Sequence, residues 1–164
     1  MKFDNIVGNP PYQDTDSRNT TPHKLWIDFT KKSFSDWLKD GGYLLQVSPS
    51  SFSSPSSKIL QLFKDKKTHK INFNQEHYFP DVATTVATYV IENSVSNNTT
   101  IINNEFTINL DNSVLYIPND FRQESFSIHS KTMFSTQPKL NVEKDYVTGH
   151  HIRLKDTMLE LQMI

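Results

Sequence analysis

The N-terminal part of the chain alternates short apolar runs with turn-forming segments. Residues 2–7, with apolar positions at Phe3, Ile6 and Val7, predict a short buried strand. That strand must end at Pro10-Pro11, because proline has no N–H group to donate to a sheet. A helix is expected next, with Thr21 as its cap and Pro22 in its first turn. The helix would present an apolar face of six residues: Leu25, Trp26, Phe29, Phe34, Trp37 and Leu38.

The same alternation continues to residue 91. Gly41 or Gly42 would end the first helix, and residues 43–47 predict a second strand. A serine-rich loop leads into a helix near residues 58–65, followed by strands at 70–73 and 85–91. The order β-α-β-α-β-loop-β favours an α/β sheet with helical crossovers.

After residue 93 the chain becomes rich in asparagine. Asparagine-containing breaks separate three short apolar runs, at residues 99–102, 106–110 and 114–117, and this spacing predicts a small β-meander. We therefore expect an α/β region over residues 1–93 and, over residues 94–164, a meander with an irregular extension that begins a target-recognition part or covers the sheet. Residues 157–164 predict a final short helix.

Composition narrows the classes of protein that remain. The 164 residues carry a formal net charge of −1, so no global basic field indicates a nucleic-acid partner, although a local basic cleft is still compatible with one. There is no cysteine, and the six histidines form no spaced metal-ligand set, so no metal site is expected. No apolar run approaches the roughly 20 residues that span a bilayer. These features predict a protein of a reducing cytoplasm.

The tetrapeptide Asn9-Pro10-Pro11-Tyr12 is the segment with readable chemistry. It follows the first predicted strand, and ligands of open α/β sheets bind at the carboxyl ends of strands. The Asn9 side chain and the Pro10 backbone each offer a carbonyl acceptor, and together they suit an exocyclic NH₂ group. Tyr12 adds a flat ring that can stack on a base removed from its duplex. The alternatives are a plain turn after a strand, or a Pro-Pro-Tyr peptide recognised by a binding domain.

Three ordered segments resemble one family. They are GNPPY at residues 8–12, DGGYLLQVSPSSF at residues 40–52 and HYFPDVATTVATYVIEN at residues 77–93. Together they resemble the catalytic half of DNA adenine-N6 methyltransferases of restriction-modification type. The resemblance implies that Asn9 and the Pro10 carbonyl bind the target amine, that Pro11 shapes the turn, and that Tyr12 stacks on the flipped adenine. It also implies a second stacking ring at Phe79, for which a core position is the alternative.

The resemblance implies S-adenosylmethionine as the methyl donor and DNA as the partner. Such enzymes hold the cofactor with a glycine-rich turn, yet the four glycines here, at 8, 41, 42 and 149, form no such loop. We therefore expect a partial Rossmann-like sheet, the catalytic half alone, with cofactor-binding residues unidentified. Three arrangements are compatible with the exposed edge of the first strand: a second chain supplies the cofactor-binding half and covers it, the polypeptide is a marginal fragment, or the fold is capped in another way. The alternative is a non-catalytic relic that binds DNA or a methyltransferase subunit.

Overall fold

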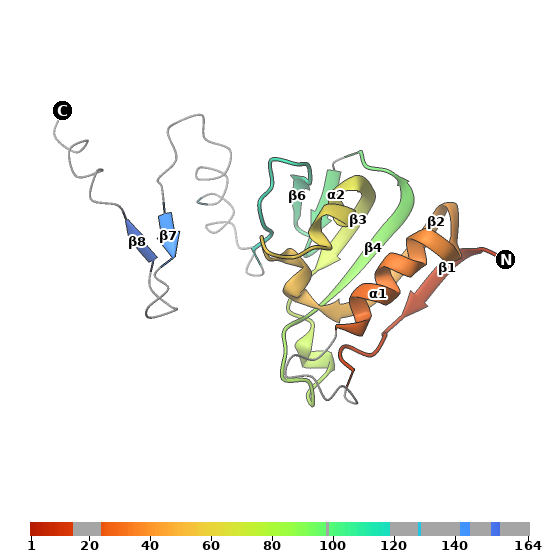
Figure 1. Ribbon diagram of the computed structural model, residues 1–164, viewed down its shortest axis with the longest axis horizontal. Coiled ribbons are helices and arrows are strands. Elements are labelled where there is room, and N and C mark those ends of the chain that lie inside the picture. Colours follow the sequence, from red (N-terminus) through yellow and green to blue (C-terminus); the bar gives the residue numbers. More distant parts are fainter. Residues whose placement is uncertain (15–23, 98, 119–127, 129–141, 145–151, 155–164) are drawn as a thin grey trace. The chain divides into compact units, whose positions relative to one another are not determined.

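The computed structural model describes residues 1–14, 24–97, 99–118, 128, 142–144 and 152–154 (Figure 1). The chain divides into two compact units, Met1–Phe126 and Ser127–Ile164. Among the described residues of the second unit, β7 (Val142–Lys144) pairs antiparallel with β8 (Ile152–Leu154). The predicted helix cap at residues 21 and 22, Gly149 and the predicted helix at 157–164 lie outside the described residues.

The first unit is built on a six-stranded mixed sheet of strand order β1-β2-β4-β3-β5-β6. β1 runs parallel to β2, β4 lies antiparallel between β2 and β3, β5 runs parallel to β3, and β6 lies antiparallel to β5. The predicted α/β class is confirmed. The strands are β1 (Phe3–Gly8), β2 (Leu38–Pro49), β3 (Lys66–Asn72), β4 (Val86–Val95), β5 (Thr99–Ile102) and β6 (Phe106–Asn109).

The predicted first strand exists, but the expectation that it is buried is wrong. β1 is an edge strand that pairs only with β2 among the described strands, and most of its residues are exposed. Val7 is 77% exposed. The local sequence alone could not distinguish a covered strand from an edge strand, because it does not reveal which strands lie beside it.

The helix after the first strand is shorter than its apolar spacing predicts. α1 (Leu25–Lys32) passes into one turn of π-helix, η1 (Ser33–Trp37), and β2 already begins at Leu38. Gly41 and Gly42, which were predicted to end the first helix, therefore lie within β2. Gly41 has a φ of +74°, and a Cβ on Gly42 would lie 2.9 Å from the carbonyl oxygen of Asp4. This close approach accompanies a register shift between β1 and β2.

The helical side of the sheet carries the core. α1 and α2 (Leu60–Asp65) lie on the same side of the sheet in Figure 1. Alternate residues of β2 and β4, such as Leu44 and Ile91, are buried beneath them. The centre is a cluster of four rings: Phe52 of the 3₁₀ turn η2 (Ser50–Ser53), Phe63, Phe73 and Tyr89.

The predicted β-meander is a hairpin that extends the main sheet. Two of its three apolar runs form β5 and β6, joined through Asn103 and Asn104, which both have positive φ. The Asn103 side chain accepts a hydrogen bond from the Phe73 backbone N–H at 2.7 Å, which ties the hairpin to the end of β3. The third run is not a strand: Val114 and Ile117 are buried and close the end of the core. The sheet thus continues past residue 93.

The opposite side of the sheet is not covered by any described element. Its side chains come from the alternate positions of the same strands, and four large apolar ones are at least 37% exposed: Val7, Tyr43, Leu45 and Ile101. We call this surface the open face. Within the described residues, no helix has the length and apolar character needed to cross a membrane.

An ion-pair cluster at the open face predicts a pH-dependent stability. Glu92 on β4 lies 2.7 Å from His69 Nε2 and 3.1 Å from Lys67 Nζ. The hydrogen bond from His69, with a further contribution from Lys67, lowers the pKa of Glu92 to about 2. A carboxylate with a lowered folded-state pKa stabilises the fold above its ordinary pKa, and this contribution is lost as the pH falls through the folded value. The loss should therefore occur between about pH 4.5 and 2.

Urea unfolding across that pH range measures the effect. Glu92→Gln should lower the free energy of unfolding at pH 7 by about 1 kcal/mol, as for a partly exposed ion pair, and should flatten its decline below pH 4.5. Glu105→Gln, at an exposed position in the β5–β6 turn, is the matched control and should leave the decline unchanged. An unaltered profile in Glu92→Gln would contradict the assignment.

Candidate functional site

The tetrapeptide follows β1, at the carboxyl end of the parallel pair β1 and β2. Gly8, the last residue of β1, pairs with Gln46 of β2, and the chain then leaves the sheet at Asn9. The Asn9 side chain is exposed and makes no hydrogen bond to any described residue. Its carbonyl oxygen is therefore available to an incoming donor. Pro10 is half-buried and fixes the backbone at this exit.

Two hollows meet at Asn9. The first, about 380 Å³, lies between the tetrapeptide and the helical layer, where Phe29 and Trp37 face Pro10 and Pro11. The second, about 480 Å³, lies on the open face between β1, β2, β3 and β4. Gln46 borders both hollows, as Asn9 does. Asn9 thus stands where the two sides of the sheet edge meet.

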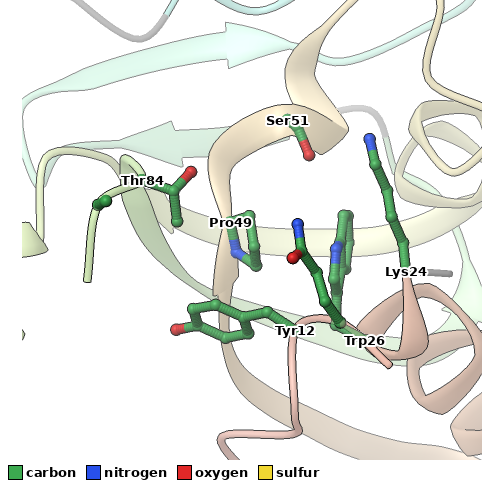
Figure 2. Close-up of a pocket in the computed structure, with 8 residues that line it drawn as sticks. Tyr12, Lys24, Trp26, Pro49, Ser51 and Thr84 are labelled. Carbon is green, nitrogen blue, oxygen red and sulfur yellow. The ribbon is translucent and has the colours of Figure 1, made fainter. Parts of the chain in front are cut away.

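A third and larger cavity begins at Tyr12. This Tyr12 cavity has a volume of about 610 Å³, within the usual range for small-molecule sites. Figure 2 shows the Tyr12 ring along one wall, with Pro49 and Trp26 beside it. Eight residues line the cavity: Tyr12, Gln13, Lys24, Trp26, Pro49, Ser51, Ala83 and Thr84.

The Tyr12 hydroxyl is buried and has no hydrogen-bond partner among the described residues. Burial raises the pKa of Tyr12 above its ordinary value, so the hydroxyl is neutral at physiological pH. A buried hydroxyl without a partner is energetically costly and is commonly satisfied by water or a ligand. The Tyr12 side chain is thus partly buried, and its ring borders the cavity.

Two contacts fix the far wall of the Tyr12 cavity. The Ser50 backbone N–H donates to the carbonyl oxygen of Thr85 at 2.9 Å, and the side-chain hydroxyls of these two residues also contact each other. They join the end of β2 to the end of the loop before β4. Ser51 and Thr84, the neighbours of this junction, consequently present their side chains to the same cavity.

A buried polar network supports the opposite wall. The Thr30 hydroxyl donates to the Trp26 carbonyl at 2.8 Å and accepts a hydrogen bond from Gln46 Nε2 at 2.9 Å. Since the only proton of that hydroxyl is already donated, Tyr89 must donate across the 3.2 Å contact to Thr30. Burial raises the pKa of Tyr89 to about 12, which keeps it protonated for this role. The network ties Trp26 in the cavity wall to Gln46 beside Asn9.

The residues predicted from sequence are distributed over these hollows. Asn9, Pro10 and Pro11 border the smaller hollow, and Tyr12 borders the large cavity. Phe79 is half-buried in the loop between β3 and β4 and lines none of the three hollows. The same loop instead contributes Ala83 and Thr84 to the Tyr12 cavity. The proposed second ring at Phe79 therefore stays a prediction.

Sequence reasoning missed most of the cavity wall. Trp26 was assigned only to the apolar helix face; it is buried, and one part of it borders the cavity. Pro49, Ser51 and Lys24 belong to no sequence motif that would have indicated a binding site. The one available signal was position: Ser51 follows the carboxyl end of a parallel strand, where open α/β sheets bind ligands.

The described residues do not fit S-adenosylmethionine by themselves. The sheet ends at β1, with no described strand on its outer side, and the described glycines lie at the end of β1 and within β2. A glycine-rich turn that would let a cofactor approach the backbone is therefore lacking in this part of the chain. Nor does any group of three or more His, Asp or Glu side chains within the described ranges suit a metal ion.

Comparison with known proteins places the N-terminal half in a family. Residues 1–83 match the family model described as Eco57I restriction-modification methylase. No curated protein matches the chain.

Solved structures with a similar arrangement include subunits of type I restriction enzymes. The EcoKI M protein is 16% identical, with a TM-score of 0.45 over 56% of this chain and 21% of its own. A chain from a type I restriction-modification complex is also 16% identical, with a TM-score of 0.49 over 80% and 29%. A modification subunit of a putative type I enzyme from Vibrio vulnificus YJ016 is 12% identical, with a TM-score of 0.45 over 93% and 37%. The chain thus spans between about a fifth and two fifths of the solved chains.

Proposed function

Because the chain belongs to the Eco57I restriction-modification methylase family, we propose that it is the adenine-binding, catalytic part of a DNA adenine-N6 methyltransferase. The complete enzyme would transfer a methyl group from S-adenosylmethionine to an adenine flipped out of its duplex. One observation carries the proposal: at the carboxyl end of β1, an unpartnered Asn9 side chain is followed by Tyr12 in the wall of a cavity of about 610 Å³.

The chemistry assigned to these residues is electrostatic. The Asn9 side-chain oxygen and the Pro10 carbonyl each accept one hydrogen bond from the exocyclic amine of adenine. Both bonds draw the nitrogen lone pair out of conjugation with the ring, which makes it the better nucleophile. The exposed Asn9 amide is preorganised only by its backbone, so the exit from β1 determines where the amine is held.

The Tyr12 cavity would receive the adenine ring. Tyr12 supplies aromatic surface, the buried Trp26 closes the wall behind it, and Pro49 supplies a rigid apolar contact. A flipped base gives up stacking with its neighbours in the duplex, and stacking on protein rings offsets that cost.

A second chain would supply the cofactor-binding half and join along β1. This strand has an unpaired outer edge in the described part of the molecule, and the adjoining open face exposes Val7 and Leu45. Free strand edges pair readily with other chains. Completion of the sheet on that side would bring the methyl donor to the amine bound at Asn9.

A non-catalytic binding module is the second candidate. The absence of a cofactor loop from the described residues favours it, since the amine and base site is independent of that loop. Calorimetry with S-adenosylmethionine separates the two functions: no binding, with or without the product of the neighbouring upstream reading frame, would support the binding module. Micromolar binding in either case would support the enzyme.

The base site is tested with adenosine and Tyr12→Ala. Trp26 and Trp37 are the two tryptophans, so a Trp37→Phe chain reports on Trp26 alone. Adenosine should quench its fluorescence, and Tyr12→Ala should weaken adenosine binding about tenfold through lost stacking. Tyr12→Phe, which keeps the ring, should retain the affinity. Inosine carries a carbonyl in place of the amine and should bind more weakly, since it would oppose the Asn9 and Pro10 acceptors.

The control is Tyr43→Ala, which removes a ring from the open face and should leave adenosine binding unchanged. Equal losses in Tyr12→Ala and Tyr43→Ala would indicate a general effect on the fold. An absence of quenching by adenosine in the parent chain would refute the proposed base site.

A further inference from the structure

The Tyr12 cavity carries one positive charge at its rim. Lys24 precedes the first residue of α1, and its exposed side chain lines the cavity together with Trp26 and Ser51. Figure 2 shows the Lys24 side chain extending past Trp26, with its amine at the Ser51 end of the cavity rather than the Tyr12 end. The Tyr12 ring and the Lys24 amine are thus at different ends of the same hollow.

The charge of Lys24 is not neutralised within the described residues. No described residue forms a hydrogen bond or an ion pair with its amine, and no acidic side chain lines the cavity. Two other lysines of the first unit, by contrast, form ion pairs: Lys39 lies 2.8 Å from Asp4, and Lys67 lies 3.1 Å from Glu92. Lys24 is therefore available to an external anion beside the aromatic wall.

Two hydroxyl groups accompany this lysine. The side chains of Ser51 and Thr84 are exposed, line the cavity and have no side-chain partner among the described residues. A cavity with rings at one end and a free amine with hydroxyl donors at the other matches a nucleotide, in which a flat base is linked to an anionic phosphate.

Building on the proposed function, we infer that Lys24 binds a backbone phosphate of the flipped nucleotide, next to the sugar whose base enters the Tyr12 cavity. Such a contact positions the nucleotide and does not read its sequence. It would hold the backbone at the cavity rim while the base stacks on Tyr12. This assigns an electrostatic contact to a chain whose formal net charge is −1.

The test compares ligands with and without phosphate in the Trp37→Phe chain. Binding of adenosine and of a short single-stranded DNA with one adenine among thymines is followed by Trp26 fluorescence at several salt concentrations. Lys24→Gln should weaken oligonucleotide binding about fivefold at low salt and reduce the slope of log affinity against log salt by about 0.7. Its affinity for adenosine should be unchanged, and Lys24→Arg should behave as the parent chain does.

Lys31→Gln provides the matched control, since Lys31 is exposed on α1, the helix that Lys24 precedes, and lines none of the three hollows. It should alter neither the affinity nor the salt slope. An unchanged salt slope in Lys24→Gln, while adenosine still quenches Trp26, would overturn the phosphate contact and leave the base site intact. If Lys24→Gln weakened adenosine binding and oligonucleotide binding equally, Lys24 would act by shaping the cavity. This result would also overturn the phosphate contact. Failure of the parent chain to bind either ligand would refute the proposed function together with this inference.

Discussion

Asn9→Ala is expected to reduce methyl transfer to DNA by about 100-fold or more, in the assembly that carries the cofactor-binding half. The substitution removes the acceptor that would hold one hydrogen of the adenine amine, and it leaves the stacking surface of the Tyr12 cavity in place. Oligonucleotide affinity should therefore change much less than the rate. The measurement is the amount of N6-methyladenine formed in single-turnover reactions.

Two further variants sharpen this result, one on β1 and one at Asn9 itself. Asn5→Ala removes an identical, exposed side chain from β1 without touching the tetrapeptide, and it should retain the parental rate. Asn9→Asp keeps an oxygen acceptor and should retain more activity than Asn9→Ala. Near-parental transfer by Asn9→Ala would remove Asn9 from the proposed chemistry.

Phe52→Ala is expected to cost the fold about 3–5 kcal/mol. Phe52 is fully buried and touches three other rings: it stacks on Phe63 with centroids 4.5 Å apart, and it contacts Phe73 at 5.8 Å and Tyr89 at 5.4 Å. Its removal leaves a cavity at the junction of η2, α2, β3 and β4. Domains of this size are stable by only about 5–15 kcal/mol, so the variant should unfold at a much lower urea concentration.

Phe29→Ala is the matched control for the core. Phe29 is 40% exposed and meets only the edge of Trp37, at 6.0 Å, in its aromatic contacts. Its truncation should cost less than about 1.5 kcal/mol, and Phe52→Leu should recover part of the loss seen in Phe52→Ala. Similar midpoints for the Phe52→Ala and Phe29→Ala chains would show that the ring cluster is not the centre of stability.

The sequence predicted the α/β class and the order of elements because these depend on local pattern. Each predicted strand up to residue 91 overlaps an observed one, and the helix near residues 58–65 is α2. The tetrapeptide follows β1 as predicted, since two consecutive prolines cannot continue the ladder. Its chemical role remains a proposal.

What failed depends on contacts between distant segments. The first helix was drawn too long because Leu38 fits the apolar spacing of the helix, yet it is fully buried as the first residue of β2. The appended meander was predicted without its place in the sheet, because nothing local reveals that β5 pairs with β3, a contact secured by Asn103. The cavity wall needed the Ser50–Thr85 junction, which joins residues 35 positions apart.

Because β1 is exposed, it should open locally more often than the inner strands of the sheet. Local opening costs least where few apolar contacts and only one row of backbone hydrogen bonds hold a segment, and β1 is held in this way within the described residues. Its amide protons should exchange with solvent sooner than those of β4, which has a neighbour on each side. Asn9 directly follows this strand, so its position is only as well fixed as β1 is. A strand of another chain that paired with β1 would make this opening rarer. Assembly would thereby fix the position of Asn9 and complete the site.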